Sequence, residues 1–190
     1  MIYFTSDLHF CHQREFLYGP RGFSNVQEHN ETIIKNWNKI IKPTDEVYVL
    51  GDLMLNNDIE GMKCLRQLVG TIHIILGNHD TENRVENYRR CYNIASVSYA
   101  DKIKYHNYHF YLSHYPTITS NFDFDKPLKA RLINLCGHTH TKNRFEDWDK
   151  YDSPVYHIEL DAHDNKPISI DDIIQDIELK DKDRRKQYPG

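Results

Sequence analysis

Short apolar runs alternate with amphipathic stretches along much of the chain. The runs predict β-strands at residues 2–6, 47–50, 72–76, 132–136 and 155–160. Stretches with apolar residues at helical spacing predict helices at residues 26–41, 59–69 and 81–91 and from residue 170 onward. In the first of these helices, Ile33, Ile34 and Trp37 fall on one face. Strands that alternate with helices indicate an α/β fold.

A second pattern occupies the middle of the chain. Residues 97–105 and 108–113 alternate in side-chain character, and His106-Asn107 between them fits a hairpin turn. This region therefore predicts antiparallel pairing. At the helix starts, residues 24–27 are interpreted as a capping box, and Ser169 is predicted to cap the last helix.

Polar residues with metal-binding side chains follow five of the apolar runs. They are Asp7 and His9, then Asp52, then Asn78, His79 and Asp80, then His114, and finally His138 and His140. Strand ends are where α/β folds place their chemistry. Each residue alone has an ordinary structural explanation, because histidine at a strand end is often a hydrogen-bonded polar residue and aspartate after glycine often forms a turn or cap. Taken together, the five coincidences favour a site.

The residue types indicate the chemistry of that site. Four histidines, two aspartates and one amide form a mixed nitrogen and oxygen set that suits divalent manganese, iron, nickel or zinc. These are too many ligands for one ion, and two ions need a shared anionic bridge. Asp52 is predicted to give one oxygen to each ion. Asp7 and His9 are two residues apart and are expected to reach the same ion, whereas His138 and His140 could diverge to different ions.

Composition sets limits on the other possibilities. The 190 residues fit one domain, residues 1–190, with a charged tail at about 180–190. The net charge of −4 argues against binding long nucleic acid, but not against a small phosphorylated substrate. No apolar run approaches the roughly 18 residues of a membrane span, and the chain runs from Met1 directly into a strand. A cytoplasmic protein is expected, with its four scattered cysteines reduced. The oligomeric state is left open.

The ordered motifs resemble the calcineurin-like metallophosphoesterase superfamily. They are Asp7-x-His9, Gly51-Asp52, Gly77-Asn78-His79-Asp80, Ser113-His114 and Gly137-His138-Thr139-His140. The opening residues 7–12, with Arg21 and Asn30 downstream, are most similar to its short single-domain bacterial and phage members. The resemblance implies a four-layer αββα sandwich with two mixed sheets and a metal site at the strand ends. It also implies one ion on Asp7, His9, Asp52 and His140, and a second on Asp52, Asn78, His114 and His138.

The same resemblance implies a mechanism for hydrolysis of phosphate esters. A hydroxide that bridges two divalent ions, most simply manganese, would attack phosphorus in line. His79 would protonate the leaving oxygen, with Asp80 orienting it. The chain departs from many family members by lacking an arginine beyond Gly51-Asp52, so His12 and Arg21 are the candidates for binding substrate.

Charge favours one class of substrate. Two divalent ions balanced by Asp7, Asp52 and hydroxide leave roughly one positive charge, which suits a small phosphodiester of the nucleotide or cyclic nucleotide type. A phosphomonoesterase or pyrophosphohydrolase on the same core is the alternative. A non-catalytic binding scaffold is the alternative from another class, but a scaffold has no need of all seven ligands and His79.

Overall fold

Two mixed β-sheets lie at the centre of the computed structural model, which describes residues 1–119, 127–146 and 154–187. The first sheet has the order β4 (Ile94–Ser98), β3 (Thr71–Ile75), β2 (Glu46–Leu50), β1 (Ile2–Thr5) and β9 (Ile168–Ser169). Its strands are parallel except β9. The second sheet has the order β5 (Ala100–Tyr105), β6 (Tyr108–Ser113), β7 (Leu132–Cys136) and β8 (Val155–His157). Only its β5–β6 pair is antiparallel.

The continuous apolar run of β2 is explained by burial on both faces. Val47 and Val49 point into a core shared with the helices, while Tyr48 and Leu50 point into the core between the two sheets. Successive side chains of a strand face opposite sides, so one strand supplies both cores.

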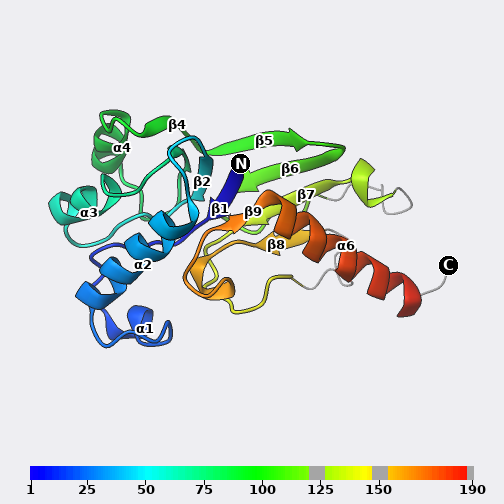
Figure 1. Ribbon diagram of the computed structural model, residues 1–190, viewed down its shortest axis with the longest axis horizontal. Helices are drawn as coiled ribbons and strands as arrows, with labels where there is room; N and C mark the ends of the chain where they lie inside the picture. The colour runs from blue at the N-terminus through cyan, green and yellow to red at the C-terminus, as the bar shows by residue number, and fades with distance from the viewer. Residues whose placement is uncertain (120–126, 147–153, 188–190) are drawn as a thin grey trace.

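The helices form two groups, at the left and at the right of the view in Figure 1. The first half of the chain contributes α1 (Glu15–Tyr18), α2 (Val26–Ile40), α3 (Asp58–Leu65) and α4 (Glu82–Arg89). Ile33 and Trp37 bury the predicted face of α2 against the first sheet. On the side of the second sheet, α6 (Ile170–Gln187) meets β8 through a hydrogen bond of 2.6 Å from Tyr156 to Asp176. The predicted α/β fold with two mixed sheets is confirmed.

The predicted strand at residues 97–105 pairs with residues 108–113 as predicted from Ala100 onward, but its first residues belong to a different strand. The chain forms β4, which is parallel to β3 in the first sheet, and then crosses to the second sheet as β5. Alternating polarity fits either sheet and does not identify the partner strand. The hairpin itself is confirmed, because Tyr105 pairs with Tyr108 around the two-residue turn.

The caps and the later elements differ in detail from the sequence prediction. Asn25 caps α2 by accepting from Glu28 N, and Glu28 accepts from Ser24 N, so the capping box is displaced by one residue. Ser169 accepts from Asp172 N as predicted.

At the carboxyl end, the strand predicted at 155–160 gives way to a 3₁₀ turn (Leu160–Ala162), and another such turn forms at Leu128–Ala130. The predicted tail is helical through residue 187, and residues 188–190 lie outside the described part. No helix in the described ranges is long and apolar enough to cross a membrane.

Candidate metal centre

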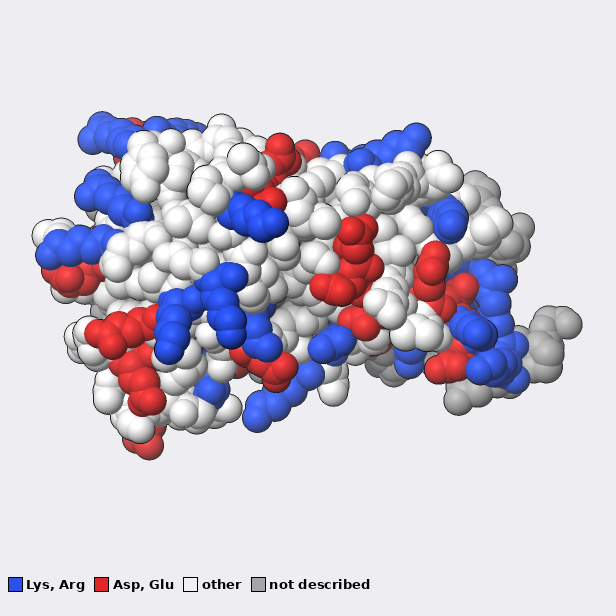
Figure 2. Space-filling model, in the orientation of Figure 1, with Lys and Arg blue, Asp and Glu red and all other residues white. Residues whose placement is uncertain are grey.

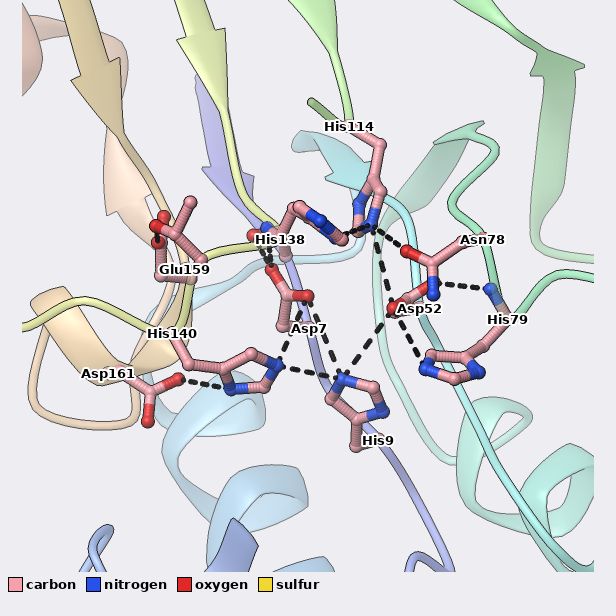
Figure 3. Close-up of polar contacts among 12 residues, drawn as sticks. Asp7, His9, Asp52, Asn78, His79, His114, His138, His140, Glu159 and Asp161 are labelled. Carbon is pink, nitrogen blue, oxygen red and sulfur yellow. Dashed lines mark hydrogen bonds and ion pairs between the residues drawn. The ribbon is translucent and has the colours of Figure 1, made fainter. Parts of the chain in front are cut away.

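The seven predicted ligands meet at one edge of the two sheets (Figure 3). Asp7, Asp52 and Asn78 follow β1, β2 and β3, which are adjacent parallel strands and therefore end at the same edge. His114 and His138 follow β6 and β7, which are also parallel neighbours. A parallel bridge between Ser6 and Glu159 joins the two sheets at this edge.

The backbone turns sharply under these ligands. Five of the seven have positive φ angles, namely Asp7 (57°), His9 (46°), Asp52 (56°), His138 (76°) and His140 (51°). Such angles are costly for residues with a Cβ and tend to collect at functional sites. Gly51 precedes Asp52 with φ of 92°, and a Cβ at Gly51 would overlap the imidazole of His114. The positive φ angles and the close approach at Gly51 are therefore features of the site itself.

One group of donors contains Asp7, His9 and His140. Asp7 Oδ2 accepts from Ser6 Oγ and from His138 N, at 2.5 and 2.9 Å, which leaves Oδ1 facing the site. Asp7 Oδ1 is buried, has no hydrogen-bond partner among the described residues, and lies 3.7 and 3.6 Å from the Nε2 atoms of His9 and His140. Those two nitrogens lie 3.1 Å apart.

The second group contains Asp52, Asn78, His114 and His138. His114 Nδ1 lies 2.8 Å from the Leu50 carbonyl, which can only accept a hydrogen bond, so the proton is on Nδ1 and Nε2 carries a lone pair. That nitrogen lies 3.0 Å from Asn78 Oδ1, 3.2 Å from His138 Nδ1 and 3.6 Å from Asp52 Oδ2.

A single carboxylate oxygen of Asp52 lies between the two groups of donors. Its Oδ2 is 3.7 Å from His9 Nε2 and 3.6 Å from His114 Nε2, whereas its Oδ1 accepts from the backbone N–H of His79 at 2.9 Å. Because Oδ1 is engaged, the predicted sharing of one oxygen with each ion does not fit this geometry. Oδ2 alone faces both groups.

The arrangement fits divalent cations. Lone pairs of carboxylate, amide and imidazole groups converge here, and convergent lone pairs repel each other unless a cation or proton lies between them. Burial lowers the pKa of His9 to about 4, and it also lowers the pKa of His138. Neutral imidazoles with free lone pairs are the form that binds metal, and the mixed nitrogen and oxygen set suits borderline ions.

His79 and Asp80 have different positions in the site. The side chain of His79 is 40% exposed, and its Nε2 lies 3.8 Å from Asp52 Oδ2, so it stands on the solvent side of the cluster (Figure 3). The Asp80 carboxylate accepts from Asp52 N, Gly77 N and Tyr88 Oη, at 2.9, 2.8 and 2.8 Å. Asp80 thus holds the loops that carry Asp52 and Asn78, and the prediction that it orients the His79 ring does not fit these contacts.

Arg21 is predicted to bind substrate, but its guanidinium is already paired within the protein. Its side chain is fully buried and pairs with Asp161, with Nη2 2.6 Å from Oδ2 and Nε 3.1 Å from Oδ1. It also donates to the Asp7 carbonyl at 2.9 Å. His12 is nearly buried, with its ring centroid 5.5 Å from that of His9. Arg21 is therefore a support beneath the site, and His12 lies at its margin.

Asp161 and Glu159 are missing from the sequence-based site. Asp161 Oδ2 lies 3.2 Å from His140 Nδ1, so Nε2 of His140 faces the cluster. Burial alone would lower the pKa of His140, but the hydrogen bond with Asp161 raises it. Glu159 is fully buried and accepts a hydrogen bond of 2.8 Å from Oγ1 of Thr139, the residue between His138 and His140. Asp161 follows the apolar run predicted at residues 155–160, which is the signal that found the other residues, whereas Glu159 lies inside that run.

We expect Asp161→Asn to weaken metal binding at the group with His140. A carboxylate that orients a ligating imidazole is worth about 10–100-fold in metal affinity. Titration with Mn²⁺ should show one weakened and one nearly unchanged binding event. Asp164→Asn is the matched control, because Asp164 is exposed and pairs with Lys166 at 3.8 Å. Unchanged affinity at both sites in a folded Asp161→Asn variant would contradict the role of Asp161.

Comparison with known proteins agrees with these observations. The chain is 34% identical over 182 residues to an uncharacterized protein of Methanocaldococcus jannaschii, covering 93% of this chain and 91% of that protein. It is 29% identical to the Gene 66 protein of Mycobacterium phage L5, covering 73% and 77% of the two chains. The crystal structure of a protein of unknown function from Aquifex aeolicus superposes with a TM-score of 0.69 at 26% identity, covering 92% of this chain and 98% of that one.

The family assignment rests on most of the chain. A sequence model of the calcineurin-like phosphoesterase superfamily domain matches residues 1–156, which include all seven predicted ligands and His79. Proteins of this family typically bind divalent metals, and the donor groups described above are suited to do so. The chain belongs to the calcineurin-like phosphoesterase superfamily.

Proposed function

We propose that this protein hydrolyses small phosphodiesters, of the nucleotide or cyclic nucleotide type, with two divalent metal ions and His79 as general acid. The observation that carries the proposal is the position of Asp52 Oδ2, 3.7 Å from His9 Nε2 and 3.6 Å from His114 Nε2. One carboxylate oxygen between two sets of lone-pair donors is what a binuclear site requires. Manganese is the proposed metal and the cytoplasm the proposed location.

Each residue of the candidate site has a proposed role. Asp7, His9 and His140 would hold one ion, and Asn78, His114 and His138 the other, with Asp52 shared. When bound, the two ions supply Lewis acidity and lower the pKa of water that attacks phosphorus. The exposed ring of His79 is accessible to a leaving oxygen and donates a proton to it.

The charges around the site favour diesters over monoesters. Two buried arginines contact the site, and both are engaged, because Arg21 pairs with Asp161 and Arg84 pairs with Asp58 at 2.7 Å. Neither guanidinium is free to bind the second negative charge of a monoester. On the face in Figure 2, basic and acidic side chains are interspersed, which suits a small substrate better than long nucleic acid.

The test compares two chromogenic esters with Mn²⁺-loaded protein. We expect faster hydrolysis of bis-p-nitrophenyl phosphate than of p-nitrophenyl phosphate. The reverse preference would favour a phosphomonoesterase or pyrophosphohydrolase. Failure to hydrolyse either ester, with metal shown to be bound, would favour a binding scaffold.

Removal of the metal should abolish hydrolysis and leave the fold. The hydrophobic cores on the two faces of the first sheet are built from many buried apolar residues that bind no metal, so the domain has its own source of stability. Excess chelator should therefore stop turnover while far-ultraviolet circular dichroism stays unchanged. Loss of the helical signal on chelation would indicate a structural metal instead.

A further inference from the structure

Two exposed aromatic side chains touch histidines of the site. Phe16 is 73% exposed and packs edge-on against His12, with ring centroids 5.5 Å apart. Tyr115 is 50% exposed and packs against both His114 and His138, with centroids 5.1 and 4.7 Å apart. Burying an aromatic side chain is favourable, so exposed rings that contact the histidines of a polar site are suited to cover a bound ligand.

These rings lie next to different donor groups of the metal centre. Phe16 reaches it through His12, whose ring is 5.5 Å from that of His9. Tyr115 directly follows His114 at the end of β6 and contacts the second donor group. Asp52 Oδ2 lies between His9 and His114, so a phosphate held over Asp52 would extend its ester groups toward Tyr115 on one side and Phe16 on the other.

From this placement, and resting on the proposed function, we infer that Tyr115 forms a stacking subsite for the nucleobase of the substrate, and that Phe16 forms a second one for the group on the other side of the phosphate. The planar π-face of a base matches an aromatic ring, and such stacking needs no charge or hydrogen bond. The neighbouring guanidiniums are consistent with this choice, because Arg21 and Arg84 are committed to Asp161 and Asp58. The subsite therefore selects a planar, uncharged group and not a second phosphate.

The test uses two diesters with the same leaving group, thymidine 5′-(p-nitrophenyl phosphate) and methyl p-nitrophenyl phosphate. Wild-type protein should prefer the thymidine ester through a lower KM. Tyr115→Ala should reduce this preference by about 5–150-fold, the range expected for loss of one stacked base. Tyr115→Phe should keep it, and Phe16→Ala should reduce it less than Tyr115→Ala, because the single base of the thymidine ester stacks on Tyr115. Tyr92→Ala is the control, because Tyr92 is 82% exposed and lies before β4, at the opposite edge of the sheet.

Three results would overturn the inference. These are a wild-type protein that does not distinguish the two esters, an unchanged preference in Tyr115→Ala, and an equal loss on both esters with loss of bound metal. The last result would make Tyr115 a support for His114 and His138. Hydrolysis of the methyl ester separately reports the proposed function. If neither ester is cleaved, binding of thymidine 5′-monophosphate relative to methyl phosphate measures the same subsite, and the same loss of preference in Tyr115→Ala is expected.

Discussion

Replacement of Asp52 by alanine should remove most of both metal ions and reduce phosphodiester hydrolysis by about 10³-fold or more. The reason is the position of Asp52 Oδ2 between His9 and His114, at 3.7 and 3.6 Å from their Nε2 atoms. Its loss removes the negative charge that both groups share, and bound metals contribute several kcal/mol to the transition state, at 1.36 kcal/mol per tenfold. Metal analysis after mild dialysis and a turnover assay measure the two effects.

Two further variants make this test specific. Asp101→Ala is the matched control, because Asp101 is an exposed aspartate of the edge strand β5 and should keep both ions. His9→Ala should lose mainly one ion, since His9 belongs to the group with Asp7 and His140. An Asp52→Ala protein that still holds two ions tightly would show that Asp52 does not bridge them.

The second large effect concerns His79 and depends on the leaving group. p-Nitrophenolate leaves readily without a proton, whereas a nucleoside alkoxide needs a proton donor, which typically contributes about 10²–10⁴-fold. His79→Ala should therefore retain both metals, show a modest defect with bis-p-nitrophenyl phosphate, and lose about 10²–10⁴-fold with a dinucleoside phosphate. Steady-state kinetics on the two substrates and metal analysis provide the comparison.

The alternatives to an acid role give different patterns. If His79 positions the phosphoryl group, both rates fall together, and if it binds metal, occupancy falls with them. His109→Ala serves as the control, because His109 lies near the start of β6, away from the end that carries His114. Equal defects on both substrates in His79→Ala would contradict the assignment.

The sequence predicts the strand-end chemistry well because two simple patterns coincide. A short apolar run such as residues 47–50, between turn residues, is typical of a strand buried on both faces, and the polar residues after it then stand at the carboxyl edge. Once the strands are parallel, Asp7, Asp52 and Asn78 must lie side by side. The gathering of the seven residues follows from local signals, whereas their roles as ligands stay predictions.

What the sequence does not predict depends on partners far along the chain. Arg21 looks like a free loop residue because its partner Asp161 is 140 residues away. Asp80 looks like a helix cap or an orienting carboxylate when only its neighbours in the sequence are considered. Its actual partner is the backbone N–H of Asp52, which belongs to another strand end. The division of residues 94–105 between two sheets likewise depends on which strand is beside each half. The polar and apolar residues near each position in the sequence do not indicate any of these arrangements.

The residues of the site lie far apart in the sequence, and this has a consequence for biosynthesis. His9 meets His140 across 131 residues, and Arg21 meets Asp161 across 140. At about 5–20 residues per second, a ribosome needs roughly 10–30 s to pass from Asp7 to Asp161. A nascent chain with only strands β1 to β4 of its first sheet formed exposes Asp7 and Asp52 without the imidazoles of His138 and His140. The seven predicted ligands are therefore all present only near the end of synthesis, and we expect metal to bind the finished domain instead of guiding its early folding.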